Sequence, residues 1–216
     1  MATPASIRPF VGAARIAVGA AAVAVILHTY ALSIAAGEPN PFDYFGYFTN
    51  QTSLLASAVL IVAGSVALAR RPTPGWLSHV RGAATAYLIV VAVIYNTLVP
   101  GTGTAPPWVS AVLHVVLPAL VLLDWIVVVV DRGPLPWRRL WVVLPYPIVW
   151  VVVVLVRGAT DGWVPYGFLL PENGVPSLVL HVAGLTCAVL LAGALVWALS
   201  RRRGAASHLP ARSVER

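Results

Sequence analysis

The sequence predicts an all-α, polytopic membrane protein with six transmembrane helices and with both termini in the cytoplasm. Of its 216 residues, 59% are hydrophobic and only 10% are charged, whereas roughly a quarter of the residues in a soluble domain are charged. Six separate apolar runs are long enough, with their flanks, to cross a bilayer. In the topology that these runs define, thirteen of the fourteen arginines fall on one side of the membrane.

The six apolar runs lie at residues 10–36, 52–69, 82–99, 109–130, 140–156 and 177–199. The second, third and fifth are shorter than the ~20 residues that a spanning helix needs, so we expect their helices to include flanking residues. Each run must be helical, because a bilayer offers no partners for unpaired backbone groups. Alternation of apolar and polar residues over the ~10 residues typical of a barrel strand does not recur along the chain, which disfavours a transmembrane barrel.

The basic residues are all arginines, and their positions set the predicted orientation. If the N-terminus is cytoplasmic, thirteen of them lie in cytoplasmic segments and one lies outside. The thirteen are Arg8, Arg15, Arg70, Arg71, Arg81, Arg132, Arg138, Arg139, Arg201, Arg202, Arg203, Arg212 and Arg216, and the exception is Arg157. Such an asymmetry over short loops favours cytoplasmic termini. The net charge of +7 is therefore explained by topology and does not indicate a nucleic-acid partner.

The predicted spans form a single transmembrane domain over residues 1–200. The segment 201–216 is a basic tail, rich in small and polar residues, that we expect to be disordered. The single cysteine, Cys187, lies inside an apolar run, so the chain has no intramolecular disulfide framework.

The predicted topology converts position along each helix into depth, and polar side chains gather in the outer half. These residues are His28, Tyr30, Thr49, Asn50, Gln51, Thr52, Tyr95, Asn96, His114, Arg157 and His181. The inner half has few, chiefly Tyr87, Asp124, Tyr146 and Cys187. This asymmetry predicts a polar cavity that opens towards the outer side and is roofed by the loop 163–168. Polar and aromatic residues are also common at membrane interfaces and between helices, so an interfacial belt and interhelical hydrogen bonds explain some of them equally well.

The run 109–130 carries three residues that a simple membrane anchor does not need: His114, Pro118 and Asp124. An ionisable side chain inside the bilayer costs about 3 kcal/mol or more, so such groups normally face a protein interior or a wet cavity. His114 lies ~9 Å below the start of its helix, in the outer third with Thr49. Asp124 lies ~15 Å deeper and ~80° round the helix, so it cannot orient His114 directly. We expect Asp124 to be structural, either neutral or bonded to Tyr146.

Three blocks of the sequence resemble a bacterial family of six-helix integral membrane proteins of uncharacterised function. The first is Phe42-Asp-Tyr-Phe-Gly-Tyr-Phe-Thr49-Asn-Gln-Thr-Ser-Leu-Leu55, at the entry to the second span. The others are His114-Val-Val-Leu-Pro118 followed by Leu123-Asp124, and Arg157-Gly-Ala-Thr-Asp-Gly-Trp-Val-Pro-Tyr-Gly-Phe-Leu169. Their order matches over residues 10–199. This family is distantly similar to the animal androgen-induced and androgen-dependent transmembrane proteins, which hydrolyse fatty acid esters of hydroxy fatty acids.

The resemblance implies a lipid ester hydrolase with Thr49 as nucleophile and His114 as its base, and Thr52 is a rival nucleophile in the same block. The residues suit this chemistry, because a threonine hydroxyl becomes an effective nucleophile only when a base such as an imidazole, ~3 Å away, takes its proton. The side-chain amides of Asn50 and Gln51, or backbone N–H groups at the start of the helix, are candidates for stabilising the oxyanion.

The remaining candidate residues are expected to line the pocket. Arg157 is placed to hold a fatty-acid carboxylate near the mouth, although an interfacial anchor explains it equally well. The other pocket candidates are His28, Asn96, Tyr166 and His181. We expect the substrate to be a membrane lipid or a lipid-like molecule that enters from the outer leaflet of a bacterial plasma membrane. No cofactor, metal or nucleic acid is implied, and the sequence indicates no particular protein partner.

Three other functions fit the same sequence. His28, His114 and His181 lie on three helices in the outer half, and three imidazoles are able to bind zinc while two are able to ligate haem. Prolines in the fourth and fifth spans would interrupt those helices, as in a transporter. Coupled transporters usually have charged groups near the middle of the membrane, however, and Asp124 is the only deep carboxylate here. A membrane scaffold or sensor without enzymatic activity is the third alternative.

Overall fold

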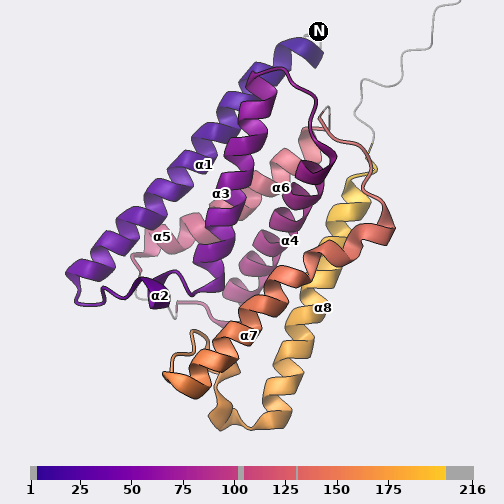
Figure 1. The fold of residues 1–216 in the computed structure, drawn as a ribbon. Helices are drawn as coiled ribbons and strands as arrows, with labels where there is room; N and C mark the ends of the chain where they lie inside the picture. Colours follow the sequence, from indigo (N-terminus) through magenta and orange to yellow (C-terminus); the bar gives the residue numbers. More distant parts are fainter. Residues whose placement is uncertain (1–3, 102–104, 130, 203–216) are drawn as a thin grey trace, which may run out of the picture.

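A computed structural model of the chain describes residues 4–101, 105–129 and 131–202 (Figure 1). Within these residues six helices are long and apolar enough to cross a membrane, and no β-strand forms. This confirms the predicted all-α fold with six spans, and the protein is an integral, multi-pass membrane protein. The orientation of the termini stays a prediction. Most of the predicted basic tail, residues 203–216, lies outside the described residues.

The spans follow one another along the chain, and two of them are interrupted. The first three are α1 (Pro4–Ala35), α3 (Phe48–Leu68) and α4 (Gly75–Leu98). The fourth consists of α5 (Pro107–Ala111), a π-helical turn η1 (Val112–Val116) and α6 (Leu117–Val127). In the fifth, a 3₁₀ helix η2 (Trp137–Val143) precedes α7 (Pro145–Thr160), and the sixth is α8 (Val175–Leu199). The short helices α2 (Pro41–Tyr44), η3 (Gly167–Leu169) and η4 (Pro171–Asn173) lie in the connections.

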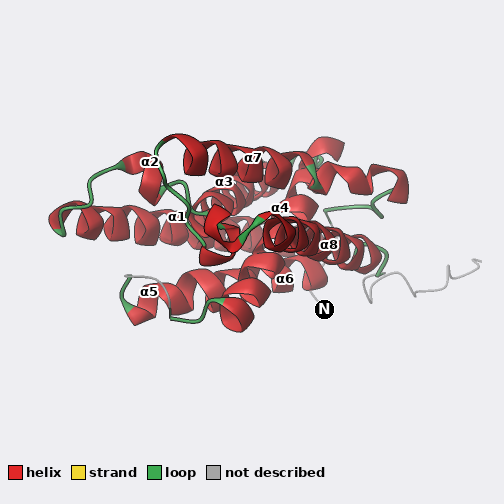
Figure 2. Cartoon of the chain, turned by 90° about the horizontal axis from the view of Figure 1, so that it is seen from below, coloured by secondary structure: helices red, strands yellow, loops and turns green. Residues whose placement is uncertain are grey.

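Figure 2 shows the helices as layers, with α7 on one side of the molecule, α5 and α6 on the other, and α1, α3, α4 and α8 between them. α1 packs closely along α3 because glycines face the partner helix. A Cβ atom on Gly12 would lie 2.8 Å from the carbonyl oxygen of Gly64, and one on Gly19 would lie 2.8 Å from that of Ser57. Small residues at such positions let transmembrane helices approach each other closely.

Four charged side chains form a buried network at the end of the bundle where α1 begins, which we call the arginine end. Arg15 of α1 donates through Nε to Asp124 Oδ1 at 2.8 Å and through Nη1 to Asp131. Arg81 of α4 donates to Asp124 Oδ2 at 2.8 Å and to Asp131 Oδ2 at 3.0 Å. Burial alone would raise the pKa of Asp131, but the two guanidinium groups outweigh it and hold this pKa below its ordinary value. The network therefore ties α1, α4 and α6 together.

This network corrects two expectations. Arg15 and Arg81 are each only 3% exposed, so they are buried ion-pair partners and not loop charges of the kind that the orientation rule counts. The expected bond between Asp124 and Tyr146 does not form. The Tyr146 hydroxyl instead donates to Gln51 Oε1 at 3.0 Å, towards the other end of the bundle.

Replacing Arg81 with methionine should destabilise the protein strongly, because the change leaves two buried carboxylates with one guanidinium group. Removing one partner of a buried ion pair typically costs ~3–5 kcal/mol. We expect a large fall in the midpoint of thermal unfolding, followed by tryptophan fluorescence of the protein in detergent. Arg139→Met, at an exposed position of the same end, is the matched control and should change the midpoint little. Equal midpoints for the two variants would contradict the role given to the network.

Candidate active site

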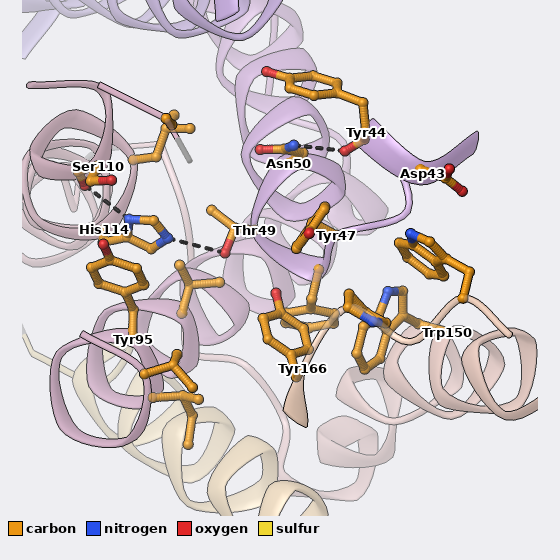
Figure 3. A pocket seen from close by; sticks show the side chains of 18 of the residues that line it. Asp43, Tyr44, Tyr47, Thr49, Asn50, Tyr95, Ser110, His114, Trp150 and Tyr166 are labelled. Atoms are coloured by element: carbon orange, nitrogen blue, oxygen red, sulfur yellow. Dashed lines mark hydrogen bonds between the residues drawn. The ribbon is translucent and has the colours of Figure 1, made fainter. Parts of the chain in front are cut away.

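The opposite end of the bundle, which we call the cavity end, encloses a cavity of about 1330 Å³. Its walls come from the end of α1, α2, the start of α3, the end of α4, α5 with η1, α7, the loop 163–168 and α8. Four of the predicted site residues line it: Thr49, Asn50, His114 and Tyr166 (Figure 3). Most other lining side chains are apolar, which suits a lipid-sized molecule with few polar groups.

The cavity lies beside α7, whose backbone is set apart from the other spans although its Trp150 and Val154 side chains are buried in the core. Among the described elements, η2 is the one against which the backbone of α7 packs most extensively. Side-chain hydrogen bonds connect α7 to the segment 42–51 across the gap. They run from Tyr146 to Gln51 Oε1 at 3.0 Å, from Trp150 Nε1 to the Gly46 carbonyl at 2.9 Å, and from Arg157 Nη1 to the Phe42 carbonyl at 3.1 Å.

Thr49 is the second residue of α3, and its side chain faces His114 (Figure 3). The Thr49 Oγ1 and His114 Nε2 atoms are 3.3 Å apart, within hydrogen-bonding reach. α3 begins after Tyr47, whose side chain makes no capping hydrogen bond. The first backbone N–H groups of a helix have no acceptor within it, and those of Phe48 and Thr49 lie beside the Tyr166 hydroxyl.

His114 has a defined tautomer, because its other ring nitrogen has a carbonyl partner. His114 Nδ1 lies 2.9 Å from the carbonyl oxygen of Ser110, one turn earlier. A carbonyl oxygen only accepts hydrogen bonds, so Nδ1 carries the proton and donates it. Nε2 is therefore unprotonated and accepts a hydrogen bond from the Thr49 hydroxyl. The Ser110 carbonyl orients the imidazole as the carboxylate does in a Ser-His-Asp triad.

The backbone around His114 is shaped by Pro118. A proline has no N–H, so the carbonyl four residues earlier, that of His114, loses its helical partner. Asn96 at the end of α4 compensates, because its Nδ2 donates to this carbonyl at 3.3 Å, and the chain widens into the π-turn η1. Such turns occur frequently at functional sites. Tyr95, beside Asn96, stacks on the imidazole with ring centres 3.4 Å apart and planes 9° from parallel.

The three residues that follow Thr49 have other partners. The Asn50 amide donates to the last carbonyl of α2 at 2.7 Å, and the Gln51 side chain accepts the hydrogen bond from α7. Thr52 is fully buried, and its hydroxyl donates to the Phe48 carbonyl at 2.7 Å. Thr52 is not among the residues that line the cavity, which leaves Thr49 as the better nucleophile.

Arg157 does not line the cavity, and its guanidinium group is occupied by carboxylates of the protein itself. Its Nη2 donates to Asp43 Oδ1 at 2.6 Å and to Asp161 Oδ2 at 2.7 Å. Its guanidinium group also lies over the Trp163 ring, 4.2 Å from the ring centre. Arg157 therefore fastens the end of α7 to α2 and to the loop 163–168.

The three histidines do not come together. The His28 ring is exposed and lies 6.0 Å from that of Trp108, while His181 Nδ1 lies 2.8 Å from the Ser177 carbonyl. Neither ring lines the cavity that holds His114. Across the described part of the chain, no group of three or more His, Cys, Asp or Glu side chains is arranged to hold a metal. The three-histidine metal site that the sequence allowed as an alternative is therefore not formed among these residues.

Sequence reasoning missed the Ser110 carbonyl, and it placed Tyr95 in the outer half without predicting that its ring stacks on His114. The spacing carried a partial signal, because Ser110 precedes His114 by one helical turn and Pro118 follows it by one. The widened turn between these residues is a backbone feature that the side-chain pattern does not predict.

No protein-family model, curated protein or solved structure matches this chain. The site is therefore interpreted from its own geometry. The resemblance to the six-helix bacterial family and to the animal hydrolases stays an expectation based on the three blocks of sequence.

Because the Ser110 carbonyl holds the proton on Nδ1, neutral His114 should populate the Nδ1–H tautomer. Nitrogen NMR of isotope-labelled histidine in detergent micelles, above neutral pH, would distinguish the two tautomers. The spectrum of His114→Gln would assign the signals by difference. A dominant Nε2–H tautomer would contradict the site as described, because Nε2 would then be unable to accept the Thr49 proton.

Proposed function

We propose that this protein is a membrane-embedded hydrolase of lipid acyl esters, in which Thr49 is the nucleophile and His114 is the general base. One observation carries the proposal: Thr49 Oγ1 lies 3.3 Å from His114 Nε2, on an imidazole whose Nδ1 is held by the Ser110 carbonyl. A nucleophile, a base and a group that orients the base are the parts that covalent ester hydrolysis requires. They lie together in a largely apolar cavity of lipid size.

In the first half of the reaction, Thr49 Oγ1 attacks the ester carbonyl carbon while His114 Nε2 takes the hydroxyl proton. The tetrahedral intermediate then breaks its bond to the alcohol oxygen, and the imidazolium returns the proton to the departing alcohol. In the second half, a water molecule attacks the acyl-threonine and gives its proton to Nε2. The acyl–oxygen bond to Thr49 breaks, the proton returns to Oγ1, and the fatty acid leaves.

Tyr166 is the side chain best placed to stabilise the oxyanion, in place of the expected Asn50 and Gln51 amides. Figure 3 shows its hydroxyl pointing towards Thr49, and the backbone N–H groups of Phe48 and Thr49 lie beside it. Burial raises the pKa of Tyr166 to about 12, so its hydroxyl keeps the proton that it would donate. A fixed neutral donor beside the nucleophile stabilises negative charge as it develops.

The position of the cavity supports a substrate that comes from the membrane. The cavity lies at one end of the spanning helices, and the gap beside α7 is lined by side chains such as Ile148, Val151 and Val189. If the arginine end is cytoplasmic, as the distribution of arginines predicts, the cavity lies at the level of the outer leaflet. The resemblance to the bacterial family favours a plasma membrane as its location.

The test of this proposal is covalent labelling of the detergent-purified protein by a fluorophosphonate probe that carries an alkyl chain. We expect the wild type to be labelled and Thr49→Ala to lose all labelling. His114→Gln should label at least ~100-fold more slowly, because a general base typically contributes 10²–10⁴-fold. Tyr166→Phe should label more slowly by a similar factor, as is typical when one oxyanion donor is removed.

Thr97→Ala is the matched control, because Thr97 lies on an exposed turn near the end of α4 and does not line the cavity. Its labelling rate should equal that of the wild type. Size-exclusion chromatography would show that every variant is folded. An unlabelled wild type, or full labelling of Thr49→Ala, would contradict the proposal.

A further inference from the structure

The charged side chains that line the described walls of the cavity are both acidic: Glu38 and Asp43. No arginine is among the lining residues, and the chain has no lysine. Glu38 is exposed and has no ion pair among the described residues. A molecule in the cavity therefore meets two carboxylates and no cationic side chain on the described walls.

We call the part of the cavity around Glu38 and Asp43 its mouth. The positive charge of Arg157, which pairs with Asp43, does not neutralise the negative charge there. It is shared between Asp43, at 2.6 Å, and Asp161, at 2.7 Å. Together with Glu38 these groups carry one positive charge and three negative charges, which gives a net charge of −2 at the mouth. A substrate carboxylate would have to displace Asp43 or Asp161 in order to pair with Arg157.

We infer that the site accepts acyl esters that carry no negative charge and discriminates against esters that carry a carboxylate, with Glu38 and Asp43 as specificity-determining residues. This inference rests on the proposed function. A carboxylate that enters an apolar cavity loses hydration, and here it gains no cationic partner to compensate. Glu38 and Asp43 repel it further, and focusing of the field by low-dielectric walls strengthens such repulsion.

The negative field of the mouth extends to the aromatic wall next to the nucleophile. The pKa of Tyr47 is raised, first by burial and then by the charges of Glu38 and Asp43. The Tyr47 ring packs edge-on against Tyr166, with ring centres 5.9 Å apart, and Tyr166 faces Thr49. The same field also disfavours retention of the fatty-acid product, which becomes a carboxylate as it is released.

The inference separates this protein from the substrate class that the sequence resemblance implies. Esters between a fatty acid and a hydroxy fatty acid keep one free carboxylate, for which Arg157 was the expected partner. With Arg157 engaged by two carboxylates, the site instead fits a neutral ester, such as an acyl ester of glycerol or of a long-chain alcohol.

The test compares two chromogenic esters of equal length that differ only at the far end of the acyl chain. One is para-nitrophenyl dodecanoate, which ends in a methyl group, and the other is mono(para-nitrophenyl) dodecanedioate, which ends in a carboxylate. The full-length protein in a non-ionic detergent is assayed with both at low ionic strength. We expect the ratio of kcat/KM for the neutral ester to kcat/KM for the charged ester to be at least ~10. Added salt should lower this ratio, because it screens the repulsion.

Glu38→Gln should also lower the ratio of the two kcat/KM values by ~3-fold or more, because it removes one carboxylate without disturbing the Arg157 ion pairs. Glu172→Gln, an exposed acidic residue of η4 that does not line the cavity, is the matched control and should leave the ratio unchanged. The inference is overturned if the wild type hydrolyses the two esters equally well, or if Glu38→Gln and Glu172→Gln give the same ratio. Hydrolysis of neither ester above the level of Thr49→Ala would instead overturn the proposed function, and the inference with it.

Discussion

The arrangement of the whole bundle depends on the buried ion pairs of Arg15 and Arg81 with Asp124 and Asp131. Four charges in a membrane protein are costly unless each is paired, so α1, α4 and α6 must meet in one register at the arginine end. That register sets the other end as well. η1, which holds His114, leads directly into α6, and the last turns of α4 carry the residues that contact His114. α1 packs along α3, whose second residue is Thr49.

The cavity end is built from departures from regular helix packing. Pro118 frees the carbonyl of His114, the chain widens into a π-turn, and Asn96 and Tyr95 then fix the backbone and the ring. The backbone of α7 lies apart from the other spans, and hydrogen bonds from its side chains to the segment 42–51 connect it to the bundle. A rigid nucleophile–base pair therefore borders a space large enough for a lipid, and the acidic mouth adds selection by charge.

Much of the fold followed from elementary patterns, whereas the partners of the charged residues did not. Apolar runs gave six spans, and the short runs at 52–69 and 82–99 were extended by their flanks to Phe48 and Gly75, as expected. Thr49 and His114 were placed at one depth, and the structure brings them into contact. The ion-pair partners of Arg15 and Arg157 could not be predicted, because sequence position gives depth but not which helices are neighbours. The tautomer of His114 could not be predicted either, because it depends on the position of the Ser110 carbonyl.

If Thr49 is the nucleophile, it carries the acyl group during turnover, and tandem mass spectrometry of the trapped adduct would locate that group. The protein would be quenched in acid during turnover of a neutral para-nitrophenyl ester, or after reaction with the fluorophosphonate, and digested. We expect an added mass on Thr49 in the peptide that spans residues 42–55. An adduct on Thr52 or Ser53, or on a residue outside the cavity, would contradict it.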